Sequence, residues 1–243
     1  MIQVAYRVRF RPSCNGPLHL GSLYTAWQCW QIAKSRGGEF VLIADCTVPE
    51  GKWGRRLTKE ERHDQVEEWL EDLNWLGLTP QLVVHSSDDW LRAAHRIACQ
   101  HLRVPIQDGS EAPSLNRYVW GPWEGGTLTS YQPYLVVGRV TDDHELGISA
   151  FMRGADLLAE AQLYDWFAWQ LYGYNYRVQQ GYGPVLCGPE GEKFSKSAGC
   201  PWTVAALKAD GYTPEDVLAG FRNLRKAPPD YGDAAQQYAM PGI

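Results

Sequence analysis

Hydrophobic and polar positions alternate at the start of the chain, and this pattern predicts a strand over residues 2–10 with one buried face. Apolar side chains then recur at helical spacing, so a helix is expected over residues 20–34, with Gly37-Gly38 ending it. The short apolar run at residues 40–44 is typical of a buried parallel strand. Strand, helix and strand in this order indicate a parallel sheet with crossover helices.

The same alternation continues along the next part of the chain. Thr58 and Glu61 are spaced as a capping box, and the apolar positions after them predict a helix that Gly77 ends. A strand is expected over residues 82–85, followed by a helix with a Ser- and Asp-rich cap that continues to Leu102. We therefore predict an α/β fold with a parallel sheet.

The pattern changes over residues 104–129, which are rich in Pro, Gly, Ser and Trp and are interpreted as a compact insertion. Regular structure is expected to resume with a strand over residues 134–141 and a helix over residues 156–172. Two short strands and a last helix are expected near Arg177, Val185 and Thr213, respectively. We thus divide the chain into the first half of an α/β domain, an insertion, the second half of that domain, and a helical C-terminal segment with a tail, over residues 1–103, 104–133, 134–200 and 201–243.

Composition narrows the class of protein. The 243 residues and 44% hydrophobic content fit a globular domain with a sizeable core. The net charge of −5 argues against a general nucleic-acid coat protein, which needs a broad basic field, while basic clusters at residues 52–59 and 222–226 leave room for local contacts. No two of the six cysteines stand as a C-x-C or C-x₂-C pair, so no structural zinc site is expected.

The chain has no basic segment leading into an apolar run at its start, and no apolar stretch approaches the length of a membrane span. We therefore expect a cytoplasmic protein that makes no membrane contact. We also expect it to be a monomer.

Two short segments carry the candidate chemistry. The first, from His19 to Ser22, opens the helix that follows the first strand, and the second, from Lys193 to Ser197, lies in a Gly-rich loop. Cleavage of ATP at its α-phosphate needs a helix N-terminus for phosphate and mobile positive charge for the transition state. The two segments together therefore predict an ATP site.

The segment from Arg9 to Gly21 resembles the opening signature of class I glutamyl-tRNA synthetases. Further matches follow in family order, at residues 37–40, 75–78, 142–143 and 153–158 and in the Lys193 loop. Residues 153–158 most resemble the shortened branch called glutamyl-Q tRNA(Asp) synthetases, which lacks an anticodon-binding domain, and we expect this chain to lack one too. The resemblance implies a Rossmann-like catalytic domain that uses ATP, Mg²⁺ and glutamate.

The resemblance also implies roles for individual residues. The catalytic residues would be His19, Lys193 and Lys196. Other ATP-binding residues would be Pro12, Gly16, Gly21, Ser22, Asp156 and Ser195. The amino acid would be bound by Arg9, Ser13, Asp45, Tyr134 and Arg153.

The chemistry of these side chains agrees with such roles. An arginine can hold a carboxylate through two parallel hydrogen bonds, which suits Arg9 and Arg153 at apparent strand ends. Asp45 would pair with the α-ammonium group, and Tyr134 reads equally well as a core aromatic. No protein-borne metal site is expected.

Three departures from the family pattern bear on the acceptor. Asp45 stands where the family has Glu, and the neighbouring Arg and two acids of that motif are absent. The cysteines that hold zinc in many relatives have no counterparts. The insertion before Tyr134 is about half the length expected from the family, and there it grips the tRNA acceptor end. We therefore expect slow or absent charging of ordinary tRNA(Glu).

These observations predict ATP-dependent activation of glutamate to glutamyl-adenylate. The acceptor, a tRNA or a modified tRNA base, is left open. Glutamine is an open alternative to glutamate as the amino acid. Other hypotheses are a cofactor adenylyltransferase of the same fold, an adenylate-forming enzyme with a non-tRNA acceptor, and an impaired paralogue that binds RNA or a partner. The Lys193 motif argues against the first, and the presence of His19, Lys193 and Lys196 argues against the last.

Overall fold

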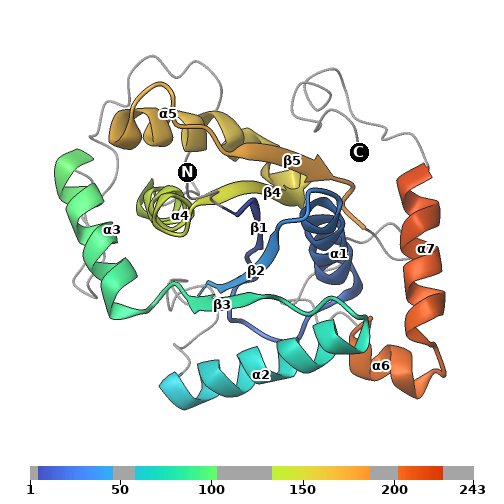
Figure 1. Ribbon diagram of the computed structural model, residues 1–243. Coiled ribbons are helices and arrows are strands. Elements are labelled where there is room, and N and C mark those ends of the chain that lie inside the picture. The colour runs from blue at the N-terminus through green and yellow to red at the C-terminus, as the bar shows by residue number, and fades with distance from the viewer. Residues whose placement is uncertain (1–4, 46–57, 103–132, 187–201, 227–243) are drawn as a thin grey trace.

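The computed structural model describes residues 5–45, 58–102, 133–186 and 202–226. Its five strands form one sheet in the order β3-β2-β1-β4-β5, and each pair of neighbours runs parallel (Figure 1). This is the strand order of a Rossmann-type sheet: β2 and β3 are added on one side of β1, and β4 and β5 are added on its other side. The strands are β1 (Arg7–Phe10), β2 (Glu39–Ala44), β3 (Leu82–His85), β4 (Ile148–Gly154) and β5 (Gln179–Gly183).

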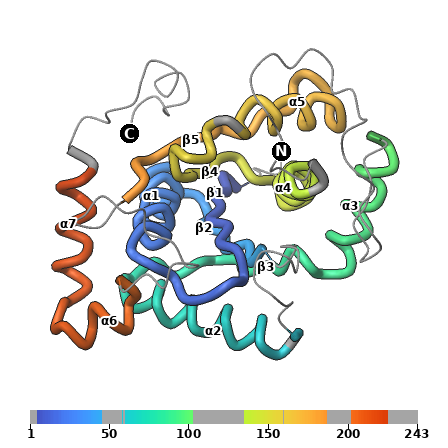
Figure 2. Tube along the Cα trace, turned by 180° about the vertical axis from the view of Figure 1, so that it is seen from behind, coloured from blue at the N-terminus to red at the C-terminus, as the bar shows by residue number. Residues whose placement is uncertain are grey.

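Helices cover both faces of the sheet (Figures 1 and 2). One face carries α1 (Leu20–Ser35), α2 (Lys59–Trp75), α6 (Val204–Ala209) and α7 (Pro214–Lys226). The other carries α3 (Asp89–Leu102), α4 (Pro133–Glu145) and α5 (Ala161–Tyr172). A short 3₁₀ helix, η3 (Ala155–Glu160), joins β4 to α5.

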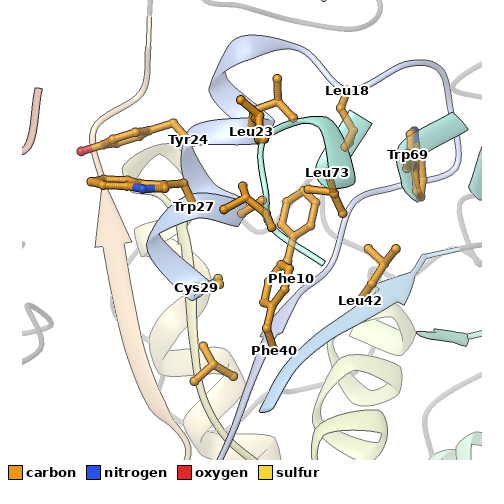
Figure 3. Packing of buried hydrophobic residues seen from close by; sticks show 14 of the residues in the cluster. Phe10, Leu18, Leu23, Tyr24, Trp27, Cys29, Phe40, Leu42, Trp69 and Leu73 are labelled. Atoms are coloured by element: carbon orange, nitrogen blue, oxygen red, sulfur yellow. The ribbon is translucent and has the colours of Figure 1, made fainter. Parts of the chain in front are cut away.

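The alternation in the strands separates two cores. Phe10 and Phe40 lie side by side toward α1, where Trp27 stacks on Tyr24 with ring centroids 5.7 Å apart (Figure 3). Residues of the opposite parity, such as Val41, point toward α4 and α5. Each face is apolar because a parallel sheet is covered on both sides.

Several sequence predictions are confirmed. The first helix is present as α1, and the predicted strand at residues 82–85 coincides with β3. The strand expected over residues 2–10 is β1, which spans only Arg7–Phe10; residues 5 and 6 are not part of it, and residues 2–4 lie outside the described residues. The capping box is formed, since Thr58 Oγ1 accepts from Glu61 N at 3.1 Å and Glu61 Oε2 accepts from Thr58 N at 2.8 Å. The last helix begins at Pro214.

The prediction of a strand over residues 134–141 is wrong, because this segment lies in helix α4. Val136, Val137 and Val140 are all buried and are spaced as on one side of a helix. The composition of a short β-branched run does not distinguish a buried helix from a buried strand. The strand that pairs with β1 on the side away from β2 is β4, which follows α4 in the chain and was not predicted.

Other boundaries also differ from the prediction. The helix expected from residue 156 begins as η3 and becomes α-helical only at Ala161. The two strands expected near Arg177 and Val185 are a single strand, β5, and α6 was not predicted. The proposed hairpin in the insertion, the Lys193 loop and the C-terminal tail lie outside the described residues, and the division into domains remains a prediction.

Within the described ranges, no helix combines the length and the hydrophobicity needed to cross a membrane.

Candidate active site

Three of the predicted site residues, Pro12, Ser13 and Asp45, lie at the carboxyl ends of the neighbouring strands β1 and β2. The segment after β1 runs beside the end of β2, since Cys14 N donates to Asp45 O at 3.0 Å and Asp45 N donates to Pro12 O at 2.9 Å. Ser13 and Asp45 form a parallel bridge there. Because the strand order reverses at β1 and β4, this edge is where an open α/β sheet binds its ligand.

His19 begins helix α1 as its N-cap residue. Its Nδ1 accepts a hydrogen bond from Ser22 N at 3.3 Å. A Cβ atom at Gly21 would lie 3.1 Å from His19 Cε1, so the glycine leaves room for the imidazole ring. The backbone N–H groups and the dipole of this helix attract negative charge to its N-terminus.

The chain returns to this helix start after the Lys193 loop. Leu20 N donates to Trp202 O at 2.8 Å, and His19 and Thr203 form an antiparallel bridge. Residues just beyond the second motif therefore lie against the first motif. Lys193, Ser195 and Lys196 themselves are outside the described residues.

Helix α2 holds the turn that precedes His19. Trp69 Nε1 donates to the carbonyl oxygen of Gly16 at 3.1 Å. Gly16 has a φ of 132°, a conformation that favours glycine over residues with a Cβ. Trp69 is fully buried, so the turn is anchored in the core.

Arg9, which is expected to bind the amino acid, is paired with a carboxylate of the chain itself. Its Nε and Nη2 atoms donate to the two carboxylate oxygens of Asp143 at 2.7 and 2.8 Å, and the residue is 2% exposed. Its guanidinium carbon lies 4.0 Å from the centre of the Phe151 ring, and Tyr164 Oη also donates to Asp143 at 2.7 Å. The chain itself thus supplies the carboxylate that Arg9 holds.

The electrostatics of this pair follow from its burial. Burial alone would lower the pKa of Arg9, but Asp143 reverses the effect, so the pKa is raised. Burial and the nearby Asp143 carboxylate raise the pKa of Tyr164 well above its ordinary value. Both groups keep their protons and continue to donate to Asp143.

Arg9 is one of three arginines, Arg7, Arg9 and Arg11, at alternate positions in β1 and just after it. Arg7 Nη1 donates to Leu146 O, just after α4, at 2.8 Å, and Arg11 Nη1 donates to Asp142. Arg11 Nε also donates to Asp45 at 3.2 Å. Positive side chains at every second position therefore meet the carboxyl end of α4, where the helix dipole is negative.

A second buried group, which sequence reasoning missed, surrounds Arg153. Glu160 Oε2 accepts from Arg153 Nη2 at 2.5 Å and from Arg139 Nη1 at 2.7 Å. Arg139 Nε also lies 3.9 Å from Asp45 Oδ2. Burial, followed by the charge of Arg153, lowers the pKa of Arg139. Arg153 and Asp45 are thus linked through Arg139 and Glu160.

One signal could have identified the helix face that carries Arg139. Arg139, Asp142 and Asp143 are spaced i, i+3 and i+4, which places them on one face of a helix. The mistaken strand prediction hid that spacing. Asp142 Oδ1 also lies 2.5 Å from His95 Nε2, which ties α3 to the same face.

The remaining predicted residues are less tightly placed. Asp156 is exposed in the first turn of η3, and a Cβ at Gly154 would lie 2.4 Å from its Oδ1. Tyr134 lies in α4, and its side chain falls outside the described part of the structure. No three His, Cys, Asp or Glu side chains converge as metal ligands among the described residues.

Comparison with known proteins agrees with this geometry. Residues 5–100 match the family model "tRNA synthetases class I (E and Q), catalytic domain". The chain is 31% identical over 234 residues to a glutamyl-Q tRNA(Asp) synthetase of Synechococcus sp. (strain CC9605), covering 80% of this chain and 75% of that protein. It is 27% identical to a glutamate–tRNA ligase of Azorhizobium caulinodans, covering 88% of this chain and 55% of that protein.

Solved structures show the same fold. A glutamate-tRNA synthetase from Elizabethkingia anophelis superposes with a TM-score of 0.66 at 19% identity, covering 93% of this chain and 63% of that one. A tyrosyl-tRNA synthetase from Archaeoglobus fulgidus superposes with a TM-score of 0.59 at 20% identity, covering 96% and 70%. The sequence relatives and the shared fold together place the chain in the class I tRNA synthetase family of the glutamate and glutamine type.

Proposed function

We propose that this protein activates glutamate with ATP, forming glutamyl-adenylate and pyrophosphate. The observation that carries the proposal is the meeting of two segments at the start of α1. His19 and Gly21 open the helix, and Leu20 N bonds to Trp202 O, a short distance along the chain from Lys196. This contact supports a site in which both motifs act on one ATP molecule.

The proposed reaction needs no general base. An oxygen of the α-carboxylate of glutamate attacks the α-phosphorus of ATP, and the bond to the pyrophosphate leaving group breaks. The carboxylate is already ionised at pH 7, so catalysis comes from alignment and from positive charge around the phosphates. The N-terminus of α1, His19, Lys193 and Lys196 would supply that charge.

The amino acid would lie at the ends of β1, β2 and β4. Asp45 is suited to the α-ammonium group, and Ser13 bridges to it directly. Arg153 is suited to the side-chain carboxylate. The burial of Arg9 against Asp143 supports a structural role for Arg9, which would hold α4 in place behind the pocket.

Magnesium would arrive with the nucleotide. Mg²⁺ keeps several waters and is commonly held by substrate phosphates with one or two carboxylates. We therefore propose MgATP as the form that the site takes. The second step is transfer of the activated amino acid to a tRNA or to a modified base of a tRNA. This proposal leaves the acceptor in that step open.

Amino-acid-dependent exchange between ATP and labelled pyrophosphate tests the activation step. All twenty amino acids should be screened, with and without bulk tRNA, and glutamate should support exchange without tRNA. Lys196→Ala should slow exchange by about 10²–10³-fold, as expected for one lost charge donor. Absence of exchange with every amino acid under both conditions would contradict the proposal.

A further inference from the structure

Glu160 bridges two arginines beside the end of β4. A single oxygen, Oε2, accepts from Arg139 at 2.7 Å and from Arg153 at 2.5 Å. The Glu160 side chain is 2% exposed, so the bridge lies inside the protein. Arginine is the side chain most often used where a carboxylate is recognised. Here, the chain supplies a carboxylate of its own.

The bridge is part of a larger buried series of charges. Arg139 lies near Asp45, Asp45 accepts from Arg11, and Arg11 donates to Asp142. Together with Glu160 and Arg153, these side chains carry equal formal positive and negative charge. A ligand carboxylate that enters next to Glu160 brings a negative charge that this group does not compensate.

Arg139 is the most accessible member of the series. Its side chain is 16% exposed, against 8% for Arg153 and 2% for Glu160. A ligand would therefore reach the arginine pair from the side of Arg139. It would meet guanidinium groups that already share a carboxylate.

We propose that Glu160 is a specificity-determining residue, an internal carboxylate that competes with the side-chain carboxylate of the amino acid for Arg139 and Arg153. The inference rests on the proposed activation of glutamate. Its consequence is weak discrimination between glutamate and glutamine. The amide of glutamine can accept from an arginine without repelling Glu160, whereas the carboxylate of glutamate cannot.

Pyrophosphate exchange with the two amino acids tests this role. The quantity measured is the ratio of kcat/KM for glutamate to that for glutamine. In the wild-type protein, this ratio should stay below about tenfold. Glu160→Gln keeps the size and one acceptor oxygen but removes the charge, and it should raise the ratio at least about tenfold, because hydrogen bonds to charged groups are the strong ones.

Asp142→Asn is the matched control. It removes one negative charge from the same series without touching the Arg139–Arg153 pair, and it should leave the ratio within about twofold of wild type. An equal rise in this variant would show that overall charge, and not Glu160, sets selectivity. An unchanged ratio in Glu160→Gln would overturn the proposal directly.

The wild-type protein decides the matter if Glu160→Gln does not fold. A preference for glutamate above about tenfold in the wild-type protein would contradict the proposal without any variant. Calorimetric titration of both amino acids, in the presence of a non-hydrolysable ATP analogue, gives the ratio of their dissociation constants as a second measure of selectivity. If exchange occurs but the glutamate-to-glutamine ratio differs from the prediction, only the role of Glu160 is contradicted. If neither exchange nor binding occurs, the proposed function is contradicted together with this inference.

Discussion

The guanidinium group of Arg9 and the carboxylate of Asp143 are joined by two parallel hydrogen bonds of 2.7 and 2.8 Å, between the sheet and helix α4. Both side chains are almost completely buried, at 3% and 0% exposure. The pair links the strand that leads into the turn before His19 with the helix that carries Arg139. Its integrity therefore bears on both halves of the proposed site.

We expect Arg9→Met to destabilise the protein by about 3–5 kcal/mol, because it leaves a buried carboxylate without its ionic partner. Arg7→Met is the control, since the Arg7–Glu39 pair is about one-third exposed and should be worth less than about 1 kcal/mol. Urea unfolding monitored by tryptophan fluorescence measures both. Equal small losses would mean that Asp143 is not held by Arg9 in solution.

His19 has a capping role and a proposed catalytic role, and the two can be separated. Asn is also a good N-cap residue, so His19→Asn should keep the free energy of unfolding within about 0.5 kcal/mol of wild type. We expect the same variant to slow pyrophosphate exchange by about 10²-fold. His19→Ala should lose exchange and also about 1 kcal/mol of stability. Wild-type rates of pyrophosphate exchange in His19→Asn would show that His19 serves only as the N-cap of α1.

The successful part of the sequence prediction rests on local periodicity. Alternation in residues 2–10 and the capping box at Thr58 are properties of neighbouring residues, so the corresponding elements could be predicted. The segment over residues 134–141 failed, because a run of valines suits both a strand and a buried helix. Only the partners of those valines in the core decide between the two.

The position of the candidate site in the fold could be predicted in outline, whereas the hydrogen-bond partners of its residues could not. The carboxyl ends of the strands, the start of α1 and the acidic residue Asp45 follow from the order of elements and from the resemblance. The partner of Arg9 is separated from it by more than half of the chain, and Glu160 joins Arg153 only because η3 folds back beside β4. Such pairings depend on tertiary structure, which no local pattern contains.

Asp72 makes stability depend on pH. Burial, together with the neighbouring Glu68, raises its pKa from 3.8 to about 7. The folded protein therefore binds this proton more tightly than the unfolded chain does. The resulting stabilisation is fully present below about pH 4 and is lost as the pH rises through about 7.

Asp72→Asn should remove this dependence. At pH 8 the variant should be more stable than wild type by about 1–2 kcal/mol, a value reduced for solvent screening, and at pH 5 the gain should be smaller. Urea unfolding at both pH values measures the difference. Asp64→Asn, an exposed change on the same helix, is the control for removing a carboxylate from α2. A constant gain for Asp72→Asn would contradict the raised pKa.

Gly38 is required by a close backbone approach. A Cβ at this position would lie 2.0 Å from the carbonyl oxygen of Tyr6, so Gly38→Ala should destabilise the protein by more than about 2 kcal/mol. At Gly220 in α7, an added Cβ would meet no atom within 4 Å, and Gly220→Ala should stabilise the protein by about 0.5–1 kcal/mol. Thermal unfolding should therefore shift in opposite directions in the two variants.

The most direct test of adenylate formation follows an oxygen atom from glutamate to AMP. Glutamate labelled with ¹⁸O in its α-carboxylate is incubated with the protein, MgATP and hydroxylamine, and the AMP is analysed by mass spectrometry. Attack of the carboxylate on the α-phosphorus, followed by capture of the acyl group at carbon, leaves one ¹⁸O atom in AMP. We predict labelled AMP in a yield equal to that of glutamyl hydroxamate. Hydroxamate formed together with unlabelled AMP, or glutamate-independent release of AMP, would contradict an adenylate.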